Sequence, residues 1–222
     1  MPGEMIRLTA ADGHECDAYL ARPAGAPAAG LVVVQEIFGV NGHIRGVVDG
    51  FAADGYLTIA PALFDRAERG VALGYGEDDV TRGRALRSEI PWDKVALDMA
   101  AAADAVREAG RVVTVGYCWG GSVAWLAACR IGVDAAVGYY GGQIYELRGE
   151  TPRCPTLLHF GDQDAAIPLD QVEAVGAAHP DVTIHLYPAG HGFNCDQRAS
   201  FHADSASIAR ERTLAFFAEH LG

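Results

Sequence analysis

The chain has 222 residues, of which 50% are apolar and 21% are charged, a composition typical of globular proteins rather than of disordered or membrane-spanning ones. Its net charge of -12 argues against nucleic-acid binding, because most of the surface would repel phosphate groups. The segment 1–7 lacks the basic start and apolar core of a secretory signal, and no apolar run is long enough to span a membrane. We therefore expect a cytoplasmic protein without membrane contact.

The cysteines give no sign of a disulfide framework or a structural zinc site. They are odd in number, and no pair has the Cys-x-x-Cys spacing. The sequence also lacks a Gly-x-Gly-x-x-Gly dinucleotide loop and a cluster of metal-ligating residues, so it predicts neither a cofactor nor a metal.

In chain order, the first predicted element is a hairpin over residues 5–20, around the turn signal Ala11-Asp12-Gly13. The apolar run 31–35 predicts a strand buried on both faces. An amphipathic helix over 43–54 follows, and the strand 56–60 is expected to stop at Pro61. The polar stretch 64–92 predicts a long excursion with some helix, and excursions of this length are often functional.

The second half of the chain alternates strands with helices. The predicted elements are a helix over 93–109, a strand over 112–115, a helix over 120–130, strands over 135–140 and 156–160, a helix over 169–179, a strand over 183–187 and a C-terminal amphipathic helix. This alternation predicts a single α/β domain over 1–222, with a mostly parallel central sheet and helices on both faces.

The most specific motif is Gly116-Tyr117-Cys118-Trp119-Gly120, where an apolar strand runs directly into a helix. It matches the Gly-x-Ser-x-Gly nucleophile elbow of α/β-hydrolases with cysteine in place of serine. The two glycines let neighbouring backbones approach, and the start of the helix favours a negative charge on the sulfur. We predict that Cys118 is the nucleophile, whereas a lone buried cysteine would be an inert packing residue.

An elbow nucleophile needs a general base and a third group that orients the base, and in this fold the chain order is nucleophile, acid, histidine. His191 follows a predicted strand and is flanked by two glycines, so a loop can deliver its imidazole to the sheet edge. Asp164 is the predicted acid because Asp-x-x-Ile-Pro resembles the acid loop of α/β-hydrolases, with Asp162 in reserve. His159 lies inside an apolar strand, which favours a core role.

With these motifs in place, the chain resembles the dienelactone hydrolase family, or carboxymethylenebutenolidase-like proteins, over nearly its whole length. The matching segments are residues 33–39 (VVQEIFG), 60–64 (APALF), 116–121 (GYCWGG), 138–141 (GYYG), 161–168 (GDQDAAIP) and 190–193 (GHGF). The resemblance implies the α/β-hydrolase fold and hydrolysis of an enol-lactone through an acyl-thioenzyme. It also implies that Glu36 assists ionisation of Cys118, and that the backbone N–H groups of Ile37 and Trp119 form the oxyanion hole.

The sequence departs from the family where the substrate is bound. The resemblance implies an arginine four residues after the catalytic histidine, but Cys195 occupies that position and Arg198 is out of register. A second substrate-binding arginine is implied in the excursion, where the sequence does not choose between three candidates. Those candidates are Arg82, Arg84 and Arg87. Arg82, Phe38 and Tyr140 are taken as candidate substrate-binding residues.

The leading hypothesis is a hydrolase of small lactones or esters with a Cys118–His191–Asp164 triad. One alternative is a broad carboxylesterase or thioesterase that uses the same residues. A second is a non-catalytic α/β-hydrolase fold in which Cys118, with Cys195 or another thiol, is a redox sensor. The sequence does not identify the physiological substrate or the oligomeric state.

Overall fold

The computed structural model describes residues 2–221 and divides the chain into two compact units, Met1–Thr114 and Val115–Gly222. The single domain expected from the sequence stays a prediction. Strand β5 (Val112–Tyr117) contains the boundary between the two units.

The first unit is built on four strands. In spatial order they are β1 (Glu4–Thr9), β2 (Glu15–Ala21), β4 (Leu57–Pro61) and β3 (Gly30–Val34). The predicted N-terminal hairpin is present, since β1 and β2 pair antiparallel, and β3 pairs parallel with β4. All five residues of β3 are buried, as a continuous apolar run requires. Strand β4 stops at Pro61 as predicted, and Pro61 is its last residue, where it is the register partner of Ala18 in β2.

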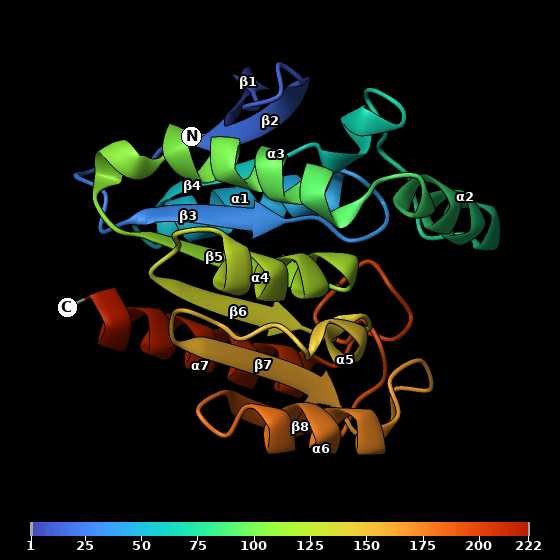
Figure 1. Ribbon diagram of the computed structural model, residues 1–222. Coiled ribbons are helices and arrows are strands. Elements are labelled where there is room, and N and C mark those ends of the chain that lie inside the picture. The colour runs from blue at the N-terminus through green and yellow to red at the C-terminus, as the bar shows by residue number, and fades with distance from the viewer. Residues whose placement is uncertain (1, 222) are drawn as a thin grey trace. The chain divides into compact units, whose positions relative to one another are not determined.

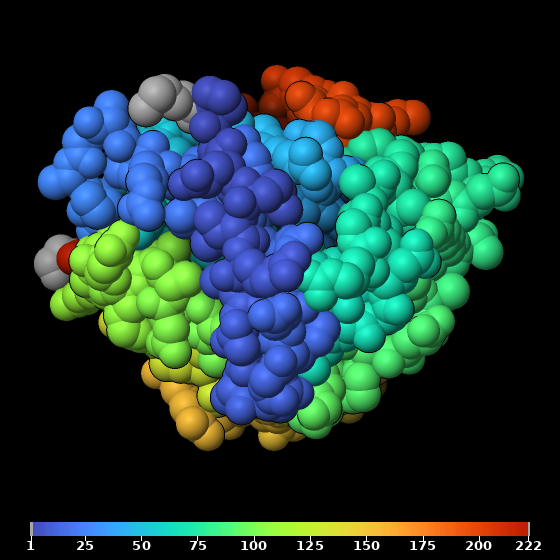
Figure 2. Space-filling model, turned by 90° about the horizontal axis from the view of Figure 1, so that it is seen from above, coloured from blue at the N-terminus to red at the C-terminus, as the bar shows by residue number. Residues whose placement is uncertain are grey.

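Helices α1 (Gly42–Ala53) and α3 (Trp92–Ala105) cover opposite faces of these strands (Figure 1). The side chain of Asn41 caps α1 by accepting a hydrogen bond of 3.1 Å from the N–H of Ile44. The excursion contains the short 3₁₀-helix η1 (Leu63–Arg66) and α2 (Glu77–Ser88), and η2 (Arg107–Ala109) follows α3. Figure 2 shows the dark-blue hairpin at the surface beside the teal excursion, where Arg69 donates to the carbonyl of Glu15 at 2.9 Å.

The second unit holds three parallel strands in the order β6 (Ala135–Tyr139), β7 (Thr156–Gly161) and β8 (Thr183–Tyr187). The helices among its described residues are α4 (Trp119–Arg130), α5 (Ile144–Leu147), α6 (Leu169–Ala178) and α7 (Ala203–Leu221). Alternation along β6 sends neighbouring residues to opposite faces, since Gly138 lies against α4 whereas the Tyr139 hydroxyl bonds to Thr213 of α7. Helices therefore cover both faces of these strands, with α4 in front and α7 behind in Figure 1.

Within residues 2–221, no helix has both the length and the apolar character that crossing a membrane requires.

Candidate active site

Cys118 lies at the turn between β5 and α4, with a backbone φ of 56° and ψ of -118°. A positive φ is uncommon for a residue with a side chain and stores backbone strain, which is typical of functional turns. The Cys118 N–H donates to the carbonyl of Tyr139, the last residue of β6, over 3.0 Å. The turn is thus fixed to the end of the neighbouring strand.

The glycines of the motif are required because the chain crosses itself closely here. A Cβ atom on Gly116 would lie 1.8 Å from the carbonyl oxygen of Gly120, and one on Gly121 would lie 2.5 Å from that of Tyr139. Both distances are far shorter than any real contact, so only glycine fits at the two positions. The sharp strand-to-helix turn that exposes the Cys118 side chain depends on them.

The His191 ring lies between a thiol and a carboxylate. Its Nε2 atom is 3.2 Å from Cys118 Sγ, and its Nδ1 atom is 2.7 Å from Asp164 Oδ2. The ring also packs edge-to-face against Tyr140, with centroids 5.1 Å apart. The loop after β8 can turn here because Gly192 adopts a φ of 79°.

Asp164, not Asp162, contacts His191. The Asp164 carboxylate is buried, and its second oxygen accepts a hydrogen bond of 2.8 Å from the N–H of Ala166. The Asp162 side chain is exposed to solvent two residues earlier. The chain therefore brings Cys118, His191 and Asp164 into one hydrogen-bonded row within the second unit.

The charges of this row favour a protonated imidazole. Burial lowers the pKa of His191, but the nearby Cys118 sulfur and then the Asp164 carboxylate outweigh it and raise that pKa to about 10. At neutral pH the arrangement is suited to an imidazolium between the Cys118 sulfur and the Asp164 carboxylate. Such a ring can give a proton to a leaving group and, once it is neutral, take a proton from water.

Glu36 and Phe38 lie in the first unit, directly after β3. The Glu36 side chain is fully buried, and the Tyr75 hydroxyl donates to its Oε2 atom over 3.4 Å. Phe38 is also buried and packs edge-to-face on the Tyr75 ring, with centroids 4.6 Å apart. A buried carboxylate needs such partners, because a charge without them is costly to desolvate.

Ile37 lies against α2, the helix of the excursion that also carries Arg82. A Cβ atom on Gly83 would lie 1.9 Å from the carbonyl oxygen of Ile37, so α2 packs directly on the backbone after β3. Neighbouring Arg82 is exposed and forms an ion pair with Glu68. The geometry in this unit therefore gives Arg82 a surface partner.

Arg198 lies closer to the His191 loop than its sequence position suggested. A Cβ atom on Gly192 would be 2.5 Å from Arg198 Nη1, whereas Cys195 is fully buried. Motif spacing missed this placement because a turn between Gly192 and Cys195, closed by a 3.0 Å backbone hydrogen bond, folds the chain back. Spacing in the sequence alone therefore does not identify which arginine lies near the loop that carries His191.

Comparison with known proteins agrees with this architecture. The sequence profile of the dienelactone hydrolase family matches residues 16–221. The chain belongs to the dienelactone hydrolase family. It is 36% identical to the carboxymethylenebutenolidase of Pseudomonas putida, over 97% of this chain and 96% of that protein.

Solved structures of related proteins share the fold. A Klebsiella pneumoniae protein provisionally named a dienelactone hydrolase is 34% identical and superposes with a TM-score of 0.84, covering 97% of this chain and 99% of that one. A dienelactone hydrolase-like promiscuous phosphotriesterase from metagenomic libraries covers 100% of both chains at a TM-score of 0.79, but its 18% identity shows the fold alone. The family has the α/β-hydrolase fold, as predicted from the sequence.

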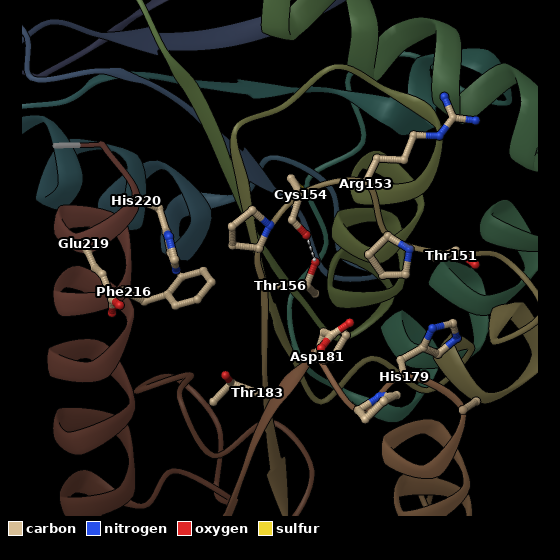
Figure 3. A pocket seen from close by; sticks show the side chains of 15 residues that line it. Thr151, Arg153, Cys154, Thr156, His179, Asp181, Thr183, Phe216, Glu219 and His220 are labelled. Atoms are coloured by element: carbon tan, nitrogen blue, oxygen red, sulfur yellow. Dashed lines mark hydrogen bonds between the residues drawn. The ribbon is translucent and has the colours of Figure 1, made fainter.

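A separate cavity of about 700 Å³ opens at the other end of the second unit's strands, where β7 and β8 begin. Figure 3 shows Phe216 and His220 reaching toward it from α7, with His179 on the opposite side. Asp181 and Glu219 in its lining are exposed. Water therefore solvates these two carboxylates, whereas burial raises the pKa of the Cys154 thiol in the same lining to about 11.

Proposed function

We propose that this member of the dienelactone hydrolase family hydrolyses small lactones or esters with Cys118 as nucleophile, His191 as proton carrier and Asp164 as the group that orients His191. The observation that carries the proposal is the placement of His191 Nε2 3.2 Å from Cys118 Sγ while Nδ1 contacts Asp164. A nucleophile, a base and an orienting carboxylate in this order can perform acyl transfer.

In the acylation step, the Cys118 thiolate attacks the carbonyl carbon of the substrate. A sulfur–carbon bond forms, the bond from that carbon to the leaving oxygen breaks, and His191 gives its proton to the leaving oxygen. In the second step His191 takes a proton from water, whose oxygen attacks the thioester and releases the acid and the thiolate. The raised pKa of His191 supports its role as proton donor in the acylation step, since it favours the imidazolium.

The negative charge that develops on the carbonyl oxygen needs hydrogen-bond donors. We assign this task to the backbone N–H groups of Trp119, the first residue of α4, and of Ile37, after β3. Glu36 is assigned to assist the ionisation of Cys118, which its complete burial supports. Phe38, Tyr140 and Arg82 stay the proposed contacts to the rest of the substrate.

The substrate class follows from the family and from the nucleophile. A thiolate is a good attacking group for activated acyl compounds, and its thioester is readily hydrolysed. The Pseudomonas putida relative is named a carboxymethylenebutenolidase. We therefore expect lactones and activated esters to be the substrates, and amides to react poorly.

The test is a panel of dienelactone, p-nitrophenyl esters and acyl thioesters, measured with wild type, Cys118→Ala, Cys118→Ser and His191→Ala. We expect wild type to hydrolyse the lactone or the activated esters, and each variant to lose at least about 10³-fold in kcat, as for other nucleophile–base pairs. Mass spectrometry of a quenched reaction should show one acyl group on the peptide that contains Cys118.

Two outcomes would overturn the proposal. Wild type could turn over none of the panel, which would leave a non-catalytic or thiol-sensing role. Alternatively, Cys118→Ala could match wild type on the compounds that react, which would move the chemistry to another residue. Faster turnover of acyclic thioesters than of the lactone would instead favour the thioesterase alternative.

A further inference from the structure

Three strands of the second unit send a polar side chain to the same helix. Tyr139 ends β6, Tyr187 ends β8, and His159 of β7 is the register partner of Tyr139. All three are at most 3% exposed. Tyr139 and His159 contact the fully buried Thr213 of α7, and Tyr187 contacts His159 and Arg212. None of these groups takes part in the reaction proposed above, and buried polar groups of this number need a reason.

The directions of the hydrogen bonds in this cluster are determined by Thr213. Its hydroxyl has one hydrogen, which it donates to the carbonyl oxygen of Ala209 at 2.9 Å, because a carbonyl can only accept. Its other two neighbours must therefore donate to it. These are the Tyr139 hydroxyl at 2.7 Å and His159 Nε2 at 3.1 Å.

His159 is consequently the Nε2–H tautomer, and its Nδ1 atom is an acceptor. The Tyr187 hydroxyl donates to Nδ1 at 2.8 Å and itself accepts from Arg212 Nη1 at 3.1 Å. A second proton on His159 would face the Tyr187 hydroxyl and deprive it of its acceptor. Burial, with the charges of His185 and Arg212, lowers the pKa of His159 to about 3, in agreement with a permanently neutral ring.

The backbone carbonyls of the same three residues accept hydrogen bonds from segments of the candidate active site. The carbonyl of Tyr139 accepts from the N–H of Cys118 at 3.0 Å. The carbonyl of Tyr187 accepts from the N–H of Asp162 at 2.8 Å, at the start of the loop that carries Asp164.

Backbone hydrogen bonds of the same residues also support the position of the His191 imidazole. The carbonyl of His159 accepts from the N–H of Tyr140 at 2.7 Å, and the Tyr140 ring packs against His191. In addition, the N–H of Ala189 donates to the carbonyl of Tyr187 at 2.8 Å, at the start of the His191 loop. Tyr139, His159 and Tyr187 therefore each combine a buried side-chain hydrogen bond with a backbone hydrogen bond to a segment of the candidate active site.

We propose that Tyr139, His159, Tyr187 and Thr213 form a positioning cluster that ties the ends of β6, β7 and β8 to α7 and so fixes the distance between Cys118 and His191. The proposal rests on the proposed function, in which these two residues exchange a proton. A displacement of about 1 Å between reacting groups can reduce a rate roughly 100-fold, so residues that do not touch the substrate can control kcat.

The test compares Thr213→Val with Thr213→Ser and with Thr156→Val. Thr213→Val keeps the shape but leaves Tyr139 and His159 without their acceptor, whereas Thr213→Ser keeps the hydroxyl. Thr156 is a matched control, since it is 3% exposed, begins β7, and donates to a backbone carbonyl, that of Cys154, at 3.0 Å. Tyr187→Phe is a second variant that removes one hydroxyl while keeping the ring, should Thr213→Val not fold.

We expect Thr213→Val and Tyr187→Phe to lose roughly 10- to 100-fold in kcat with little change in KM, and Thr213→Ser to stay within about 3-fold of wild type. Thr156→Val should lose thermal stability without losing kcat. If Thr213→Val and Tyr187→Phe keep wild-type kcat, or if Thr156→Val loses as much as they do, the cluster is structural only and the proposal is wrong.

The alkylation of Cys118 by iodoacetamide gives a second readout that needs no substrate. In wild type we expect rapid, stoichiometric labelling at neutral pH, because His191 Nε2 lies 3.2 Å from the sulfur and can accept its proton. In Thr213→Val the labelling rate at the same pH should fall roughly 10-fold or more, because a displaced imidazole no longer activates the sulfur. A wild type that labels in this way but hydrolyses nothing would refute the hydrolase and not the cluster. Identical labelling rates in wild type and all variants would refute the cluster whatever the activity.

Discussion

The two ends of the strands β6, β7 and β8 differ in how deeply their polar side chains are buried. At the carboxyl ends, Asp164, His159 and Tyr187 are buried and each has a hydrogen-bond partner that matches its chemistry. At the amino ends of β7 and β8, the cavity of about 700 Å³ is lined by ionisable groups that water reaches, among them Asp181 and Glu219 (Figure 3). Both regions belong to the same unit and share β7, β8 and α7.

The difference shows that cavity size does not identify the reactive end of the unit. Reactivity requires groups whose charge is altered by burial and by a specific partner, and the pKa of His191 is raised in this way. The exposed carboxylates at the amino ends lack such an environment, because solvent surrounds them. Substitutions at the carboxyl ends should therefore affect the reaction much more than substitutions at the amino ends.

Asp164→Asn should reduce kcat/KM by roughly 10²- to 10⁴-fold, as in other hydrolases whose orienting aspartate is replaced by its amide. The carbonyl oxygen of the introduced amide can still accept from the N–H of Ala166, so the fold is preserved, but a neutral amide cannot stabilise an imidazolium. Steady-state kinetics on the best substrate of the panel measure the effect.

The matched control is Asp162→Asn, two residues away and exposed, which should stay within about 2-fold of wild type. A large loss in Asp162→Asn together with a small loss in Asp164→Asn would exchange the roles of the two residues.

Cys118→Ala should lower the pKa of His191, because the Cys118 sulfur contributes most among the groups that raise it. In wild type the raised pKa contributes stability that is complete below about pH 6.5, the ordinary value, and is lost as the pH rises through about 10. Because the pKa of His191 is lower in the variant, the variant should lose this stabilisation at a lower pH than wild type. Titration of the imidazole proton resonances by NMR measures the shift, and an unchanged His191 pKa would mean that the two side chains do not interact.

The candidate row was predictable from sequence where the signals are local. Gly116, Cys118 and Gly120 lie within five residues, and the strand and helix on either side follow directly, so one short segment specifies the elbow. His191 was predictable from its position after a strand and between glycines. The alternating strands and helices likewise predicted the α/β fold.

The positioning cluster was not predictable from the sequence because its partners are distant. His159 and Thr213 are separated by 54 residues, and Tyr139 and Thr213 by 74. A histidine in an apolar strand is typical of a core residue, and only strand register and the packing of α7 show which hydroxyls it meets. Helix α2 was equally weak in the sequence, since most of its residues are exposed and few apolar ones mark its face.

The smallest effect is expected at the amino ends of the strands. Asp181→Asn combined with Glu219→Gln should change the free energy of unfolding by less than about 0.5 kcal/mol per site and leave kcat within about 2-fold, because exposed carboxylates are already solvated. Urea unfolding and steady-state kinetics measure the two quantities. If this double variant lost as much kcat as Thr213→Val, α7 would transmit changes at the cavity to the reacting row. The contrast between the two ends would then be wrong, because solvated groups far from Cys118 would control its chemistry as strongly as the buried ones.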